Sequence, residues 1–224
     1  MGDIHRLIVF DLDGTLIDSR EDLADAANAL IVERGGRPLP SDAVGRMVGE
    51  GAAMLVRRAL DAAGLPLDDD SVPRFLELYD ERLLRTTYVY PGLLSVVEEL
   101  SRLSPLAIVT NKPLAPTSKL VDALGLQPFF STIIGGDGPF PRKPNPSSLQ
   151  HLMETFGTTA RQTVLVGDSR IDFETARAAG TPICLVRFGF GYETFPAAQL
   201  RGDEGLADDP RQLPAIIERL LDSH

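Results

Sequence analysis

Short apolar or β-branched runs alternate with amphipathic stretches along most of this chain. The runs lie at 7–10, 106–109, 132–134, 163–166 and 183–186. Runs of this length without polar interruption are typical of strands that are covered on both faces. Helical patterns accompany the later runs, at 92–102, 114–124, 146–156 and 169–179. This repeated strand–helix–strand order predicts an α/β fold, a doubly wound and mostly parallel sheet.

A long gap separates the first run from the second. It holds about 95 residues, whereas a crossover between parallel strands needs only a dozen or so. Glycine-containing turns divide the gap into helical patterns at 19–34, 42–47, 52–63 and 72–86. The gap therefore predicts a small all-helical cap domain over 17–86, with a core domain made of 1–16 and 87–224.

The charge balance excludes some classes of partner. The chain carries 32 acidic and 22 basic residues, a formal net charge of −10. Nucleic acids and anionic membrane surfaces require a basic patch, so we expect neither as a partner. No apolar run approaches the ~20 residues that cross a bilayer, and residues 1–5 do not resemble a signal peptide. We therefore expect a cytoplasmic protein, and the sequence leaves its oligomeric state open.

Polar segments follow the predicted strands directly, at 11–15, 110–112, 135–137 and 167–172. Taken singly, each segment is equally compatible with a turn or a helix cap. The carboxyl ends of parallel strands meet at one edge of a sheet, so we expect these segments to converge. Asp11, Asp168 and Asp172 would then repel one another unless a cation neutralised them. Carboxylate oxygens without His or Cys ligands indicate Mg²⁺.

Lys143 adds a positive charge near the same edge. It precedes Asn145 and Pro146, which are residues typical of a helix start and would hold the lysine before a rigid element. A loop lysine is most often simply solvated. Beside a carboxylate cluster, however, it can supply the charge that a transferring phosphoryl group needs.

These segments resemble the motifs of the haloacid dehalogenase superfamily, in its phosphoglycolate phosphatase-like group with a helical cap inserted after the first strand. The residues 11–15, with sequence Asp-Leu-Asp-Gly-Thr, resemble the first motif, Thr110 the second and Lys143 the third. Asp168 and Asp172 resemble the fourth. The resemblance covers nearly the whole chain and implies a Rossmann-like core.

The resemblance also implies a reaction. Asp11 would attack phosphorus and form an aspartyl-phosphate, and Asp13 would act as the acid and base. Magnesium would be held by Asp11, by the backbone carbonyl of Asp13 and by Asp168, with Asp172 in a supporting position. The enzyme implied is a magnesium-dependent phosphatase.

Substrate contacts follow from the same resemblance. Thr110 and Lys143 would hold the phosphoryl oxygens, and the backbone amide of Asn111 would contribute. The segments 108–113, 134–137 and 143–146 resemble phosphoglycolate phosphatases in particular, so 2-phosphoglycolate is the small phosphate ester we expect first. The cap loop would reach the substrate through Gly49, Glu50 and Gly51, whose backbone amides open a helix and could meet a carboxylate. An ordinary helix–helix turn is the alternative for that loop.

Other functions remain open at this stage. A carbon–halogen hydrolase has no need of the second acid that Asp13 supplies, and phosphonate cleavage through a Schiff base needs a cap lysine, which 17–86 lack. A β-phosphoglucomutase or a pyrophosphatase of the same superfamily is harder to exclude. A catalytically silent binding module on this fold is the non-enzymatic alternative. The loss of Asp11 or Lys143 would have indicated such a module, and both are present.

Overall fold

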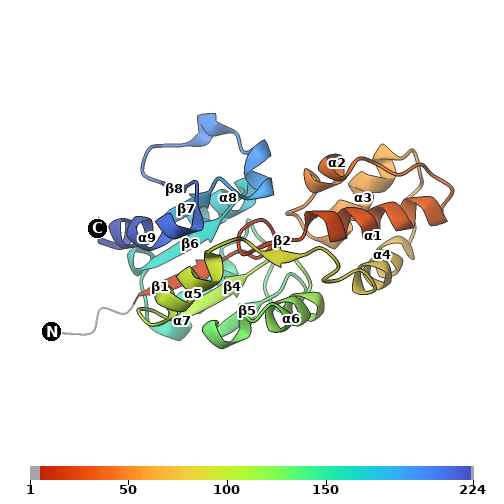
Figure 1. The fold of residues 1–224 in the computed structure, drawn as a ribbon. Helices are drawn as coiled ribbons and strands as arrows, with labels where there is room; N and C mark the ends of the chain where they lie inside the picture. Colours follow the sequence, from red (N-terminus) through yellow and green to blue (C-terminus); the bar gives the residue numbers. More distant parts are fainter. Residues whose placement is uncertain (1–5, 223–224) are drawn as a thin grey trace.

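The computed structural model describes residues 6–222, so the ends of the predicted core, 1–5 and 223–224, lie outside the described residues. Its two parts lie side by side in Figure 1: a sheet flanked by helices, and a group of helices within residues 20–80 at one end. The first and last described residues lie on the side of the sheet that is remote from these helices. None of the helices in the described part of the chain has the length and apolar character needed to span a bilayer.

A parallel sheet forms the centre of the larger part, which confirms the predicted fold class. In spatial order its strands are β5 (Thr132–Ile134), β4 (Leu106–Val109), β1 (Leu7–Phe10), β6 (Thr163–Gly167), β7 (Ile183–Val186) and β8 (Gly205–Ala207). All neighbouring strands pair in parallel. Strands β4 and β5 are added on one side of β1, and strands β6, β7 and β8 are then added on its other side. The switch point therefore lies between β1 and β6, where α/β proteins place their ligands.

Helices cover both faces of this sheet. Side chains alternate along β1, so that Ile8 and Phe10 face one apolar cluster while Leu7 and Val9 face another. The first face is covered by α5 (Leu93–Ser101), α6 (Leu114–Ala123) and α9 (Leu213–Asp222). The second is covered by α7 (Ser147–Phe156) and α8 (Arg170–Ala179). Burial on both faces explains why the strands read as uninterrupted apolar runs.

Strand β8 and helix α9 of the core were not predicted from the sequence. Strand β8 is three residues long at the sheet edge, and its central Leu206 is partly exposed. Such a short segment carries little periodic signal. Helix α9 was also missed, although its buried Leu213, Ile217 and Leu220 follow helical spacing. Short 3₁₀ segments complete the core at Gln127–Phe129, Ala160–Gln162, Phe190–Thr194, Ala197–Gln199 and Pro210–Gln212.

Between β1 and β4, the first four helices form what we term the four-helix insert, whereas α5 belongs to the core. The insert comprises α1 (Arg20–Glu33), α2 (Ser41–Gly45), α3 (Ala52–Ala62) and α4 (Ser71–Asp80). An apolar cluster of its own, drawn from residues between Leu23 and Tyr79, holds these helices together. The prediction of a helix over 72–86 was too long, because α4 ends at Asp80 and turns follow, with Leu84 at a φ of 69°.

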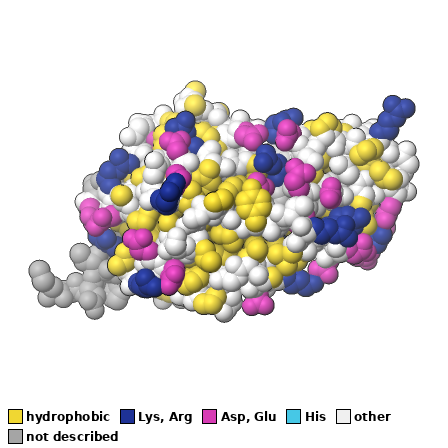
Figure 2. Space-filling model, in the orientation of Figure 1, with side chains coloured by type: hydrophobic (Ala, Val, Ile, Leu, Met, Phe, Trp, Pro, Cys, Tyr) yellow, Lys and Arg dark blue, Asp and Glu magenta, His cyan; other side chains and the backbone are white. Residues whose placement is uncertain are grey.

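Two features connect the segments at which the chain enters and leaves the insert. The antiparallel pair β2 (Ile17–Asp18) and β3 (Tyr88–Val89) joins its entry to its exit. Nearby, the buried carboxylate of Asp22 in α1 accepts hydrogen bonds from the backbone and hydroxyl groups of Thr86 and Thr87, at 2.6 to 3.2 Å. On the face shown in Figure 2, basic and acidic side chains are interspersed over both parts of the molecule.

Candidate functional site

The carboxyl edge of the sheet brings together three carboxylates that are far apart in the sequence. Asp11 follows β1, Asp168 follows β6, and Asp172 lies in the first turn of α8. One oxygen atom from each lies within 4.8 Å of the others, and all three residues are buried. The predicted convergence of these segments therefore occurs across the switch point between β1 and β6.

Lys143 lies against this cluster. Its Nζ atom is 2.8 Å from Oδ1 of Asp11 and 2.6 Å from Oδ1 of Asp172, and the ammonium group is almost fully shielded from solvent. The lysine lies in the loop between β5 and α7. At the start of α7, Ser147 N donates a hydrogen bond to the side-chain oxygen of Asn145 at 3.0 Å. A predicted loop lysine is thus a buried partner of two carboxylates.

Burial dominates the electrostatics of the cluster. It raises the pKa of Asp11 to about 7, against the opposing charge of Lys143, and it raises the pKa of Asp168 well above its usual range. For Lys143, burial opposes the charge, but Asp11 and Asp172 raise its pKa nonetheless. One ammonium group therefore does not balance three buried carboxylates. The donor set of hard carboxylate oxygens fits a divalent cation of the Mg²⁺ type.

Local structure fixes Asp172 in place. Its Oδ2 atom accepts hydrogen bonds from Ser169 N at 3.1 Å and from Ser169 Oγ at 2.6 Å, which forms a capping box at the start of α8. The other oxygen of this carboxylate is then left for Lys143. The helix cap and the carboxylate cluster therefore share Asp172, and the cap that Ser169 forms holds this residue in the cluster.

The loop after β7 is a part of the site that the sequence reasoning missed. Gly191 N donates to Oδ2 of Asp168 at 2.7 Å. A Cβ atom at Gly189 would lie 2.1 Å from the backbone oxygen of Gly14 and 2.4 Å from Cβ of Asp168. Only glycine permits this close approach. The available signal was the position of this glycine-rich loop directly after an apolar strand, as for the other site segments.

Thr110 and Asn111 lie at the end of β4 as predicted, next to the cluster. Thr110 is buried, and its backbone N donates to the oxygen of Ile134 at 3.0 Å. The Asn111 side-chain amide donates to the carbonyl oxygens of Gly49 and Lys143, both at 2.9 Å. Asn111 therefore joins three segments: the end of β4, the loop that carries Lys143, and the four-helix insert.

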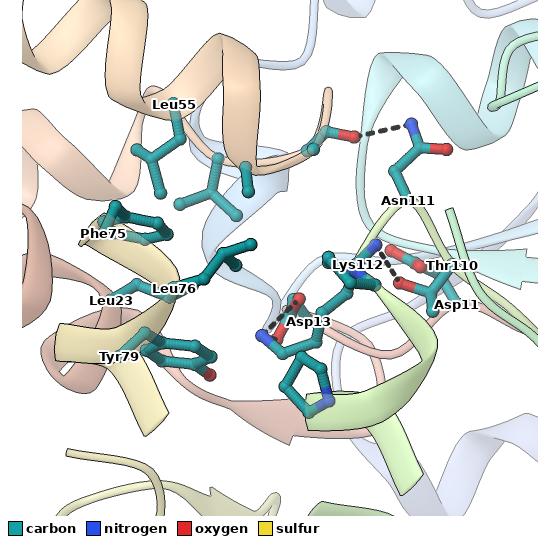
Figure 3. Close-up of a pocket in the computed structure, with 16 residues that line it drawn as sticks. Asp11, Asp13, Leu23, Leu55, Phe75, Leu76, Tyr79, Thr110, Asn111 and Lys112 are labelled. Atoms are coloured by element: carbon teal, nitrogen blue, oxygen red, sulfur yellow. Dashed lines mark hydrogen bonds and ion pairs between the residues drawn. The ribbon is translucent and has the colours of Figure 1, made fainter. Parts of the chain in front are cut away.

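A pocket of about 40 Å³ lies between the sheet edge and the insert, with room for only a few water molecules. Its two sides differ in character (Figure 3). Asp11, Asp13 and Thr110 line the side formed by the sheet edge. The insert contributes mainly apolar side chains, those of Leu23, Val48, Ala52, Leu55, Phe75 and Leu76, together with Tyr79.

The loop that begins α3 is divided between pocket and surface. Gly49 and Gly51 line the pocket, and Gly51 precedes the first residue of α3 at a φ of 89°. Glu50 is not among the described residues that line it. Its carboxylate instead forms an ion pair with Arg58 on the insert. The structure thus brings two of the three predicted loop residues to the site and directs the negative charge of Glu50 to Arg58.

Asp13 has partners different from those of Asp11. Oδ1 of Asp13 accepts a hydrogen bond from Ser19 Oγ at 2.5 Å, and Lys112 Nζ lies 3.0 Å from both carboxylate oxygens. The Asp13 carboxylate raises the pKa of Lys112 although burial opposes the charge. The sequence reasoning gave Lys112 no role. Its position two residues after Thr110, in a chain with few lysines, was the signal that could have identified it.

Comparisons with known proteins agree with this geometry. The family model described as haloacid dehalogenase-like hydrolase matches residues 8–186. The chain is 41% identical over 204 residues to a phosphoglycolate phosphatase of Rhodospirillum rubrum, covering 87% of this chain and 84% of that protein. It is 39% identical over 214 residues to the plasmid-encoded phosphoglycolate phosphatase of Cupriavidus necator, covering 94% and 92%.

A solved structure shows the same arrangement of both parts. The crystal structure of a predicted phosphoglycolate phosphatase from Haemophilus somnus superposes with a TM-score of 0.88 at 30% identity. The match covers 97% of this chain and all of that one. The similarity therefore extends through the sheet and the four-helix insert, and the resemblance inferred from the motifs is confirmed.

Proposed function

The chain belongs to the haloacid dehalogenase-like hydrolases, and from that premise we propose that it is a magnesium-dependent phosphatase of small organic phosphates that works through an aspartyl-phosphate. We propose 2-phosphoglycolate as its first substrate, because the relatives that align over most of the chain are phosphoglycolate phosphatases. The observation that carries the proposal is the buried cluster of Asp11, Asp168 and Asp172 with Lys143, which adjoins a small pocket.

Asp11 is the proposed nucleophile. Its carboxylate attacks phosphorus, the bond from phosphorus to the ester oxygen breaks, and the phosphoryl group is carried on Asp11. Thr110, Lys143 and the backbone amide of Asn111 are the proposed ligands of the phosphoryl oxygens, and Lys143 Nζ is 2.8 Å from the carboxylate of Asp11. A magnesium ion held by Asp11, Asp168 and the backbone of Asp13, with Asp172 in support, would offset the negative charge shared by nucleophile and phosphate.

Asp13 is the proposed acid and base. It gives a proton to the leaving oxygen, and in the second step it takes a proton from the water that attacks the aspartyl-phosphate. Inorganic phosphate then leaves and the Asp11 carboxylate is restored. The hydrogen bond from Ser19 and the two contacts from Lys112 fix the orientation of this carboxylate. Held in this way, it faces the pocket together with Asp11 (Figure 3).

The four-helix insert is the proposed cap domain, over 17–86, on a core of 1–16 and 87–224. Its apolar side chains cover the pocket and exclude water, which strengthens the electrostatic interactions inside. Gly49 and Gly51 bring backbone of the insert close to the substrate, whereas Glu50 is held by Arg58.

The nucleophile and the acid fail differently when they are removed, and this difference tests the mechanism. Asp11→Asn should abolish phosphoryl transfer while the fold is retained. Asp13→Ala keeps the attacking carboxylate, so p-nitrophenyl phosphate, which has a good leaving group, should still phosphorylate Asp11 slowly. Hydrolysis of the intermediate should lag by roughly 10²–10⁴-fold. Rapid acid quench and peptide mass spectrometry should then locate the phosphoryl group on Asp11.

Two outcomes would contradict parts of this proposal. A phosphoryl group on another residue, or wild-type turnover by Asp11→Asn, would exclude the mechanism. A specificity constant for pyrophosphate or a hexose phosphate about a hundredfold above that for 2-phosphoglycolate would replace the substrate assignment by a pyrophosphatase or a sugar phosphate enzyme. All assays would be run with added Mg²⁺ and repeated after removal of metal by EDTA, which should abolish turnover.

A further inference from the structure

We propose that Lys112 and Tyr79 form a carboxylate-binding subsite, which selects phosphate esters that carry a carboxylate one carbon away from the ester oxygen. The proposal rests on the phosphatase function proposed above and names the substrate class of the same pocket. The subsite spans both parts of the molecule, since Lys112 follows β4 and Tyr79 belongs to α4.

Lys112 is the positively charged group that a second anionic group of the substrate would meet. Among the described residues that line the pocket, it alone carries a basic side chain. Lys143 is held between Asp11 and Asp172, next to the proposed nucleophile. The side chain of Lys112 is 4% exposed, so its attraction for an anion is not screened by bulk water.

The ammonium group of Lys112 retains capacity for a ligand. It has three donors, and the Asp13 oxygens accept from it at 3.0 Å. On its other side lies the Tyr79 ring, with the centroid 4.5 Å from Nζ. Figure 3 shows the ammonium between Asp13 and Tyr79, facing the pocket. A ligand carboxylate that entered beside it would add an ionic hydrogen bond without displacing Asp13.

Tyr79 supplies an independent indication. The residue is 2% exposed, and no residue in the described part of the chain accepts a hydrogen bond from its hydroxyl group. Burial raises the pKa of Tyr79 to about 12, so the hydroxyl keeps its proton at neutral pH. Buried hydroxyl groups are rarely left without a partner. Lys112 has no acceptor to offer, so the Tyr79 proton needs an acceptor that enters the pocket, and a carboxylate oxygen provides one.

The position of the subsite defines the length of the substrate. Asp13 is the proposed donor to the leaving oxygen, and Lys112 Nζ contacts both oxygens of Asp13. A carboxylate joined to the ester oxygen through a single carbon would therefore lie beside Lys112. A longer chain would carry the carboxylate toward the apolar side chains of Leu55 and Phe75, where a charge is unfavourable. This geometry fits 2-phosphoglycolate better than longer phosphorylated acids.

A pair of phosphonates tests binding separately from turnover. 3-Phosphonopropionate has the shape of 2-phosphoglycolate with the ester oxygen replaced by carbon, and propylphosphonate lacks only the carboxylate. Both are titrated by calorimetry into the wild type and the variants with Mg²⁺ present. The wild type should bind 3-phosphonopropionate about ten- to a hundredfold more tightly, as expected for hydrogen bonds to charged groups. Lys112→Met should abolish this preference, and Tyr79→Phe should reduce it about three- to tenfold.

Lys119→Met is the matched control. It removes the same charge from an exposed lysine on α6 and should leave the preference unchanged. Tyr79→Phe deletes one atom and keeps the ring, so it decides the question if Lys112→Met does not fold. A wild type without preference would overturn the proposal. So would an unchanged preference in Tyr79→Phe and in folded Lys112→Met, or an equal loss of affinity for both phosphonates, which would mean that Lys112 only orients Asp13.

Turnover separates this proposal from the phosphatase function. The specificity constants of 2-phosphoglycolate and ethyl phosphate are compared in the same proteins. If the wild type discriminates between the phosphonates but hydrolyses neither ester, the phosphatase function fails while the subsite stands. If it hydrolyses both esters equally and binds both phosphonates equally, the subsite fails while the phosphatase function stands.

Discussion

The two sides of the pocket are built by different means. On the sheet side, charged groups are buried and paired, with Lys143 between Asp11 and Asp172 and Lys112 against Asp13. On the side of the four-helix insert, packing of apolar side chains such as Leu55 and Phe75 forms the wall. Reactive groups therefore depend on strand ends held by hydrogen-bonded register, whereas the shape of the pocket depends on how helices pack.

The two parts also differ in how they are held together. The sheet side is continuous with the hydrophobic core, but the insert is joined to it by a few specific contacts. These include the hydrogen bond from Asn111 to Gly49 and an ion pair between Lys119 and Asp80. Changes on the sheet side should therefore reduce activity first. Changes in the insert should alter stability or selectivity first.

The largest effect is expected from Gly14→Ala on the sheet side. Gly14 has a φ of 87°, and a Cβ atom there would lie 1.9 Å from Oδ2 of Asp168, so the carboxylate has to move. We expect the kcat/KM for 2-phosphoglycolate to fall about a hundredfold or more, because small displacements of a reacting group are costly.

Gly35→Ala in the insert is the matched control for Gly14→Ala. Its φ of 80° is also positive, a conformation that side-chain-bearing residues rarely adopt, but no atom lies within 4 Å of the added Cβ. This variant should lose about 1 kcal/mol of unfolding free energy and keep its kcat/KM. Equal kcat/KM values for the two variants would contradict the expectation that activity depends more on the sheet side than on the insert.

A smaller effect is expected from Asp22→Asn, which weakens the closure of the insert. Burial opposes the charge of Asp22, but the donors of Thr86 and Thr87 outweigh it and hold its pKa below the usual value. The variant should lose about 2–4 kcal/mol of unfolding free energy in urea at pH 7, since buried donors lose an anionic acceptor.

The destabilisation caused by Asp22→Asn should depend on pH. A depressed pKa in the folded state means that the stabilisation by Asp22 is present above its unfolded pKa of about 3.9 and is lost as the pH falls through the folded value. The difference between wild type and Asp22→Asn should therefore shrink below about pH 4. Asp25→Asn, which changes an exposed carboxylate on the same helix, should show no such difference. If the difference in unfolding free energy between wild type and Asp22→Asn stayed constant down to the lowest pH at which both proteins fold, this account would be excluded.

The smallest effect is expected from Lys119→Met. The ion pair of Lys119 with Asp80 joins α6 to α4, but about half of each side chain is exposed. Exposed pairs contribute about 0–1 kcal/mol, so urea unfolding should change by less than about 0.5 kcal/mol. Selectivity should be unchanged as well. A loss above about 2 kcal/mol would show that the surface contact helps to hold the insert in place.

Sequence alone determined the sheet and the residues at its edge. The apolar runs identified β1, β4, β5, β6 and β7, since strands buried on both faces need uninterrupted apolar side chains. Parallel strands place their carboxyl ends together, so the segments that follow them had to converge. For that reason Asp11, Thr110 and Asp168 could be selected before any coordinates were known.

Tertiary structure decided what no local pattern encodes. The partners of Lys112, one in the loop after β1 and one on α4, are far from it in the sequence and meet it only after the insert has packed. The approach of Gly191 to Asp168 likewise depends on the path of a loop over a neighbouring strand. Propensity and periodicity act over a few residues, whereas these contacts are fixed by packing across the whole chain. The proposed selectivity residues are therefore brought together by long-range packing, whereas the proposed catalytic residues could be identified from local sequence patterns.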